Sequence, residues 1–330
     1  MKNIKRTVLD VCSRVGVFDI ALKKRRWPPL ILMYHGVTRE RNFEGLCNYE
    51  GKHLPVGRFI AHLSALRRSR TVISLGQLIE GLYNGDDLSN TAAITFDDGY
   101  ENNASVAAPV LAEFGMRATF FLVSGLIGSK CFLWTDLLEL ALDRTNGESV
   151  AVPGTDRVLP LRTLKERQMA LVTIKADLKA RPDNAARDAV EKIALQLGVN
   201  ERSAFGDYRF MTWEQARYLV SAGFEVGAHT VTHPILSRVP LPLAAREILD
   251  SKEAVLRETG QCSEVFCFPN GKFADYNASI RNFCRQHFKA ALSTNRGAAA
   301  LNDIYDLKRL SPAGRGNDAN LEWALLRTHA

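Results

Sequence analysis

Short apolar segments typical of buried strands alternate along this chain with amphipathic segments typical of helices, and this alternation constrains the fold more than any other feature. Residues 92–96, 102–114 and 118–122 form one strand–helix–strand unit. Helices are predicted again at residues 212–222, 243–259 and 278–287, each followed by a strand, at residues 224–228, 265–268 and 290–293. Ser74 and Thr212 are expected to cap the helices that start there. Because polar motifs follow several of these strands, the sequence predicts an α/β fold of the TIM-like (β/α) barrel type.

Residues 131–208 interrupt this alternation. Residues 134–142 and 161–197 show helical periodicity, whereas residues 145–160 have the composition of a loop. A chain of 330 residues is long enough to carry such an addition on one large domain. The sequence therefore predicts a barrel domain over residues 27–330 with a mostly helical insertion at residues 131–208.

Composition limits the classes of protein to which this chain can belong. Hydrophobic residues make up 46% and charged residues 24% of the chain, as in ordinary soluble globular proteins. The six cysteines include no C-x-x-C pair, which indicates buried thiols in a reducing compartment rather than a disulfide framework. The net charge of +7 comes almost entirely from residues 1–26, which hold eight basic and two acidic side chains. The rest of the chain is close to neutral, so its charge gives no support to nucleic-acid binding.

Residues 1–26 combine helical apolar periodicity with basic charge. Charged residues interrupt the apolar run, so the segment lacks the pattern of a signal peptide, and it cannot span a bilayer. Two interpretations stay open: an amphipathic helix on an anionic membrane surface, or a terminal helix docked on the barrel. Without an export signal we expect a cytoplasmic protein, and the first interpretation adds peripheral contact with the inner face of the cell membrane.

Two polar motifs supply the reactive side chains. TFDDGY places Asp97 and Asp98 directly after an apolar strand, and HTVTH places two imidazoles after another. One carboxylate with two imidazoles is a common ligand set for a catalytic zinc ion, and the other carboxylate is then free to act as a base. Pro234 follows His233 directly, so we expect His229 and His233 to lie in a loop rather than a helix. The motifs together predict a metal-dependent hydrolase.

The same motifs carry a family resemblance. TFDDGY, then HTVTH, then FPNG at residues 268–271 resemble the polysaccharide deacetylases, carbohydrate esterase family 4. LMYHGV at residues 32–37 and ATFF at residues 118–121 extend the resemblance, which runs from about residue 28 to residue 309. The match is much less clear between residues 130 and 208.

This resemblance implies a distorted, incomplete barrel and a metal-dependent carbohydrate deacetylase. It makes Asp98 the carboxylate ligand of the ion, together with His229 and His233, and it makes Asp97 the general base. The expected cofactor is a divalent metal ion, with Zn²⁺ favoured by the nitrogen and oxygen donors. The expected substrate is an amino sugar in a polysaccharide, an oligosaccharide or a glycolipid precursor, from which the N-acetyl group leaves as acetate.

Two departures from the family pattern concern the base and the acid. Many members carry an arginine two residues before the proline of the third motif, where this chain has Cys267. We expect Arg309 to steady Asp97 instead; the alternative is a surface arginine on the last strand. The family's C-terminal histidine has no counterpart, and we expect His35 to be the general acid, since barrel closure brings the first and last strands together. The alternative for His35 is a hydrogen-bonded structural histidine.

The remaining expectations concern the oxyanion, the sugar and the choice of reaction. The backbone N–H of Tyr100 or Asn270 is expected to help hold the oxyanion. Trp134 and Asp136 either line a sugar groove or belong to the core. The same machinery would serve an O-acetyl esterase or a deformylase that acts on a lipid-linked sugar. The two departures also leave open an inactive carbohydrate-binding relative.

Overall fold

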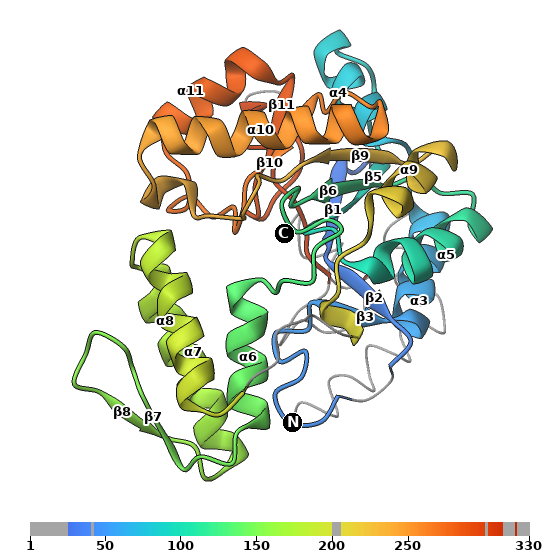
Figure 1. Cartoon of the computed structure of the whole chain (residues 1–330). Helices are drawn as coiled ribbons and strands as arrows, with labels where there is room; N and C mark the ends of the chain where they lie inside the picture. Colours follow the sequence, from blue (N-terminus) through green and yellow to red (C-terminus); the bar gives the residue numbers. More distant parts are fainter. Residues whose placement is uncertain (1–25, 41–42, 200–205, 301–302, 313–320, 322–330) are drawn as a thin grey trace.

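A curled sheet of parallel strands forms the centre of the protein (Figure 1). The computed structural model describes residues 26–40, 43–199, 206–300, 303–312 and 321. The strands of the sheet are β1 (Leu30–Tyr34), β4 (Thr71–Val72), β5 (Thr91–Phe96), β6 (Thr119–Leu122), β9 (Glu225–Ala228), β10 (Val265–Cys267) and β11 (Ala290–Leu292). They follow the order β1-β5-β6-β9-β10-β11, and β4 pairs with the beginning of β5. A separate short pair is formed by β2 (Gly36–Thr38) and β3 (His53–Pro55).

Helices cover the outer side of the sheet. They are α3 (Val56–Ser69), α4 (Leu75–Asn84), α5 (Ala108–Glu113), α9 (Trp213–Ser221), α10 (Leu241–Thr259) and α11 (Ala278–His287), and a π-helical turn, Asn103–Ala107, precedes α5. Buried residues of α3, α5 and α9 share one core with β1, β5 and β6, whereas those of α11 and of the first half of α10 pack against β10 and β11. Ser74 and Thr212 cap α4 and α9 in capping boxes, which confirms the predicted helix starts.

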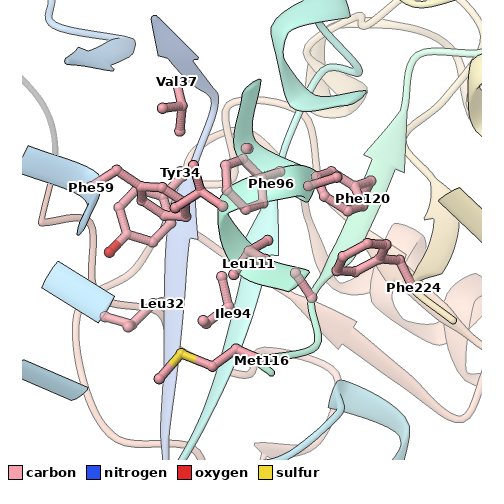
Figure 2. Close-up of a cluster of buried hydrophobic side chains, with 14 of the residues drawn as sticks. Leu32, Tyr34, Val37, Phe59, Ile94, Phe96, Leu111, Met116, Phe120 and Phe224 are labelled. Atoms are coloured by element: carbon pink, nitrogen blue, oxygen red, sulfur yellow. The ribbon is translucent and has the colours of Figure 1, made fainter. Parts of the chain in front are cut away.

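A row of aromatic rings lies along three adjacent strands (Figure 2). Tyr34 of β1 stacks on Phe96 of β5 with 5.4 Å between ring centroids, and Phe96 stacks on Phe120 of β6 at 4.9 Å. Each pair is also a register pair of neighbouring strands. Because side chains alternate between the two faces of a strand, Phe96 packs against the helices while Thr95 and Asp97 face the barrel interior. This outer core therefore sets the direction in which Asp97 points.

A short segment closes the barrel between β11 and β1. The Leu307 N–H donates to the Ala291 carbonyl at 2.9 Å, and the Leu310 N–H donates to the Ile31 carbonyl at 2.8 Å. Residues 307–310 thus bridge the last and first strands where a regular barrel would have further strands and helices. The fold is the distorted, incomplete TIM-like barrel that the sequence predicts.

A second group of elements stands beside the barrel, in the region of the predicted insertion (Figure 1). It consists of α6 (Trp134–Arg144), β7 (Ser149–Ala151), β8 (Val158–Pro160), α7 (Leu164–Lys179) and α8 (Asp183–Gln196), which share a hydrophobic core of their own. β7 and β8 pair as an antiparallel hairpin, which corrects the expected loop at residues 145–160. Strands of three residues are too short to show the alternation by which a sequence predicts strands.

The predicted boundary between residues 26 and 27 stays a prediction. Residues 1–25, which hold nearly all of the predicted basic helix, lie outside the described residues, so its contact with a membrane also stays a prediction. Within the described ranges, each helix is too short or too polar to cross a bilayer.

Candidate metal centre and active site

Asp97 and Asp98 lie where β5 leaves the sheet. The Asp97 N–H donates to the Tyr34 carbonyl at 2.9 Å, so the backbone continues the pairing of β1 and β5 by one residue. Asp98 then adopts a left-handed conformation with a φ of 73°, which aspartate tolerates better than most residues. The chain therefore turns between the two carboxylates, and only 4% of each side chain is exposed.

The motif with the two histidines forms a loop after β9. Thr230 and His233 have φ angles of 66° and 64°, outside the right-handed helical region, as expected from the proline that follows. The His229 N–H donates to the Leu122 carbonyl at 3.1 Å, which anchors the start of the loop to β6. The Thr230 hydroxyl accepts a hydrogen bond from the His233 N–H at 3.0 Å, so the loop folds back and brings the two imidazoles together.

Glu247 of α10 holds the middle of this loop. Its carboxylate accepts hydrogen bonds from the N–H groups of Val231 and Thr232 at 2.9 and 2.8 Å. It also accepts one from the Thr232 hydroxyl at 2.8 Å. One carboxylate therefore satisfies three donors between the two histidines and fixes the loop that presents them.

We expect a Glu247→Gln variant to bind zinc about 10- to 100-fold more weakly, the usual effect of losing an outer partner that orients metal ligands. The glutamine side chain can present only one acceptor oxygen to donors that now meet two, so the loop loosens. Competition with a chromophoric chelator measures the affinity. Glu253→Gln, an exposed position of the same helix, is the matched control. Equal zinc affinity in both variants would show that the loop needs no support from Glu247.

Asp98, His229 and His233 have the geometry of a metal-binding triad. The Asp98 Oδ1 atom lies 3.5 Å from His229 Nε2 and 3.4 Å from His233 Nε2, and all three donor atoms lie within 4.8 Å of one another. A tetrahedral ion with bonds of about 2.1 Å separates its ligands by about 3.4 Å. The Nδ1 atom of His229 faces the Cys267 carbonyl at 2.8 Å, which directs the proton to Nδ1 and leaves Nε2 free for an ion. The residues therefore fit a divalent metal.

The charge states of Asp98 and His233 suit an ion as well. Burial alone would raise the pKa of Asp98, but the hydrogen bond to His229 holds it well below its ordinary range. Burial lowers the pKa of His233 to about 3, so its imidazole is neutral at physiological pH. An ionised carboxylate and a neutral imidazole are the forms that bind metals.

A second group, Asp97, His229 and Cys267, is also close enough to hold an ion. Burial raises the pKa of the Cys267 thiol, whereas a metal ligand must be a thiolate. Both oxygens of Asp97 are already engaged by Arg309. We therefore assign the ion to the group that contains Asp98.

Arg309 reaches Asp97 from the segment that closes the barrel. Its two terminal nitrogens donate to the two carboxylate oxygens of Asp97, each at 2.7 Å, and its Nε donates to the Ser293 carbonyl at 2.8 Å. None of the Arg309 side chain is exposed, so it is not a surface arginine. Burial alone would raise the pKa of Asp97, but the charge of Arg309 more than offsets this and keeps the pKa below its ordinary value. Asp97 is therefore an ionised, oriented carboxylate beside the metal triad.

Asp97 and the three residues of the metal triad line one cavity of about 340 Å³. His35, at the end of β1, is half-buried and lines the cavity together with Asp97, Asp98 and both histidines of the loop. Asn270 of the third motif also lines it, with a left-handed backbone at a φ of 58°. The structure thus brings these predicted residues together around one space.

Tyr100 does not line this cavity. Its hydroxyl donates to Asp136 at 2.7 Å, its ring stacks on Phe210, and its backbone pairs with Phe210 in a β-bridge. These contacts engage the side chain of Tyr100, and the expected role of its backbone N–H at the oxyanion stays a prediction. Trp134 does line the cavity, whereas Asp136 is buried beside it.

The cavity is also lined by charged residues that lie outside the three motifs. Lys175 and Lys179 of α7 line it, as do Glu50 and Lys52 from the loop before β3. The signal in the sequence is weak: the two lysines of α7 are four residues apart and so share one helix face, a spacing found in many surface helices. Only the docking of α7 against the barrel shows that this face lines the cavity.

Comparisons with known proteins support the fold and the family. Streptococcus pyogenes deacetylase PplD, solved in complex with acetate, is similar with a TM-score of 0.59 and 18% identity, over 93% of this chain and 100% of that one. IcaB from Ammonifex degensii gives 0.58 and 14%, over 90% and 97% of the two chains. At such identities the likeness concerns the fold alone.

Sequence comparison reaches the family directly. YxkH of Bacillus subtilis (strain 168), assigned to the polysaccharide deacetylases, is 30% identical over 111 residues, which is 33% of this chain and 37% of that protein. The chain thus matches little more than a third of that relative's length. The sequence model described as "Polysaccharide deacetylase" matches residues 84–287, more than half of the chain and the part that holds Asp97, Asp98 and both histidines. The chain belongs to the polysaccharide deacetylase family, hydrolases that act on acetylated carbohydrates.

Proposed function

We propose that this chain is a zinc-dependent hydrolase that removes the N-acetyl group from an amino sugar of a polysaccharide, an oligosaccharide or a glycolipid precursor and releases acetate. One observation carries the proposal: the donor atoms of Asp98, His229 and His233 lie within 4.8 Å of one another, beside a carboxylate that Arg309 holds ionised. Two imidazoles and one carboxylate favour zinc among the divalent ions and leave a position open for substrate.

The chain's own residues supply the proton transfers. When bound, zinc would act as a Lewis acid that polarises the acetyl carbonyl and lowers the pKa of water at the site. Asp97 takes the proton of the attacking water, and its ion pair with Arg309 fixes the direction in which the carboxylate points. We assign the backbone N–H of Asn270, a residue that lines the cavity, to help hold the oxyanion of the tetrahedral intermediate.

Cleavage of the amide needs an acid as well as a base. The amine is a poor leaving group until its nitrogen is protonated, and His35 lies on the wall of the same cavity as Asp97. We assign it to this step: the C–N bond breaks, the nitrogen takes the proton from His35, and the products are acetate and a free amino sugar.

We expect a His35→Ala variant to release acetate about 100-fold more slowly, at the lower end of the range for acid–base catalysis, because water can reach this half-buried position. His287→Ala, on α11 away from the cavity, is the control. Initial rates at saturating substrate provide the measurement. Turnover near that of the wild type would remove the acid role from His35.

Product analysis tests the function as a whole. The zinc-loaded protein is incubated with chito-oligosaccharides, with an N-acetylated glycolipid, and with N-formyl and O-acetyl analogues, and the released acid is identified. Acetate from the amides, abolished by chelation and restored by zinc, is the expected result. If acid were released from only the formyl or ester analogues, the protein would be a deformylase or an esterase instead of an N-deacetylase. Protein that neither binds zinc nor hydrolyses any of the substrates would be a carbohydrate-binding relative.

A further inference from the structure

A wall of lysines faces the cavity next to the metal triad. Lys175 and Lys179 lie one turn apart on α7, and Lys52 comes from the loop that precedes β3. Only 12% of the Lys175 side chain and 17% of the Lys52 side chain are exposed. Burying an ammonium group costs free energy unless a partner of opposite charge pairs with it, so we expect each of these lysines to have such a partner.

Two of these lysines have carboxylate partners and one does not. Lys175 pairs with Glu50 at 2.6 Å, and Lys52 pairs with Asp136. Lys179 instead donates to the side-chain oxygen of Asn270 at 2.6 Å, a neutral amide. Among the residues that the structure describes, no carboxylate lies within ion-pair distance of Lys179, so its charge is the uncompensated one.

The surroundings of Lys179 show that its charge is poorly stabilised. Burial, and then the neighbouring charge of Lys175, lower the pKa of Lys179 to about 8. The ammonium form still prevails at neutral pH. An anion bound beside it would stabilise that form, as would any negative charge in a partly buried position.

The cations of this wall suit a phosphate ligand. The cations of this wall are lysines, and no arginine is among the described residues that line the cavity. Lysine binds phosphate as a point charge, whereas the planar fork of arginine is favoured where two parallel hydrogen bonds fix a carboxylate or a phosphate. Lysines gathered in a concave site also concentrate anionic ligands there.

We propose that the substrate is an N-acetylated amino sugar that carries a phosphate ester, and that Lys179, supported by Lys175, binds this phosphate while the acetamido group faces Asp97 and the metal triad. This assignment of the substrate class rests on the proposed deacetylase function. A nucleotide sugar and a lipid diphosphate sugar both offer the required group.

Kinetics with matched substrates test the proposal. The values of kcat/KM are compared for neutral N,N′-diacetylchitobiose, for UDP-N-acetylglucosamine and for a short-chain prenyl diphosphate N-acetylglucosamine. We expect one or both phosphorylated substrates to be preferred, and Lys179→Gln to reduce that preference by roughly 10- to 100-fold, the effect of losing a hydrogen bond to a charged group. Lys179→Arg should restore part of it. Lys165→Gln, an exposed position of the same helix, should leave the preference unchanged.

A binding measurement separates this proposal from the deacetylase function. Pyrophosphate is titrated calorimetrically into chelator-treated wild type and Lys179→Gln protein, so that no metal ion binds the probe. Binding that weakens in the variant supports the phosphate site even if no acetate is released. Acetate release without a preference for phosphorylated substrates, and pyrophosphate binding that does not depend on Lys179, would overturn the proposal and leave the deacetylase function intact. The preferred phosphorylated substrate identifies the source of the phosphate.

Discussion

An Asp97→Asn variant is expected to release acetate about 100- to 10,000-fold more slowly than the wild type, the usual range for a lost general base. A carboxamide cannot accept the proton of the attacking water at neutral pH. The variant keeps the metal triad, so its zinc affinity should stay close to that of the wild type. Rates with saturating zinc, together with chelator competition on the same samples, measure the two properties separately.

The matched control is Asp98→Asn, the same change one residue further along the chain. It removes the charged oxygen that lies 3.5 and 3.4 Å from the two imidazoles, so zinc affinity should fall and activity should recover only partly at high zinc. The opposite pattern, with weak zinc binding in Asp97→Asn and normal binding in Asp98→Asn, would exchange the two roles. It would also favour the alternative metal group that includes Cys267.

Much of the fold could be predicted because its signals are local. α11 begins and ends at the predicted residues, since apolar spacing and the cap at Asn277 both act within one or two turns. The carboxylates and histidines could be located because strand ends place them. The hairpin of β7 and β8 could not be predicted, because its three-residue strands are held by pairing with each other and carry no sequence pattern of their own.

Contacts between distant parts of the chain were harder to predict. Arg309 lies 212 residues from Asp97, and only the unusual Cys267 in the third motif pointed to the need for such a partner. Lys179 lies 91 residues from Asn270, and nothing in the helical pattern of α7 shows that its lysines face the cavity. Tyr100 lies in a recognisable motif, yet the motif does not show that its side chain contacts Asp136 and Phe210. Local patterns thus locate the ligands, whereas their partners depend on packing.

An Arg309→Met variant is expected to lose about 3–5 kcal/mol of the free energy of unfolding, the usual cost of leaving a buried charge without its partner. Asp97 would keep its burial but lose both 2.7 Å hydrogen bonds. Arg309→Lys keeps the charge but not the fork, so its loss should be smaller. Arg217→Met, which breaks an ion pair at a largely exposed arginine, should change stability by about 1 kcal/mol or less. Urea unfolding measures all three variants.

The pH dependence of this loss separates the ion pair from simple packing. In the wild type the folded pKa of Asp97 lies below its unfolded value, so the stability it contributes is complete above the unfolded pKa, about 4, and is lost as the pH falls through the folded pKa. In Arg309→Met the main charge that opposes burial is gone, so we expect the folded pKa to rise instead and stability to fall as the pH rises towards neutral. The difference between the two proteins, measured without metal, should therefore widen from about pH 4 to pH 7. A constant difference would mean that Arg309 stabilises the barrel through packing and its bond to Ser293, and that the base is ionised by other means.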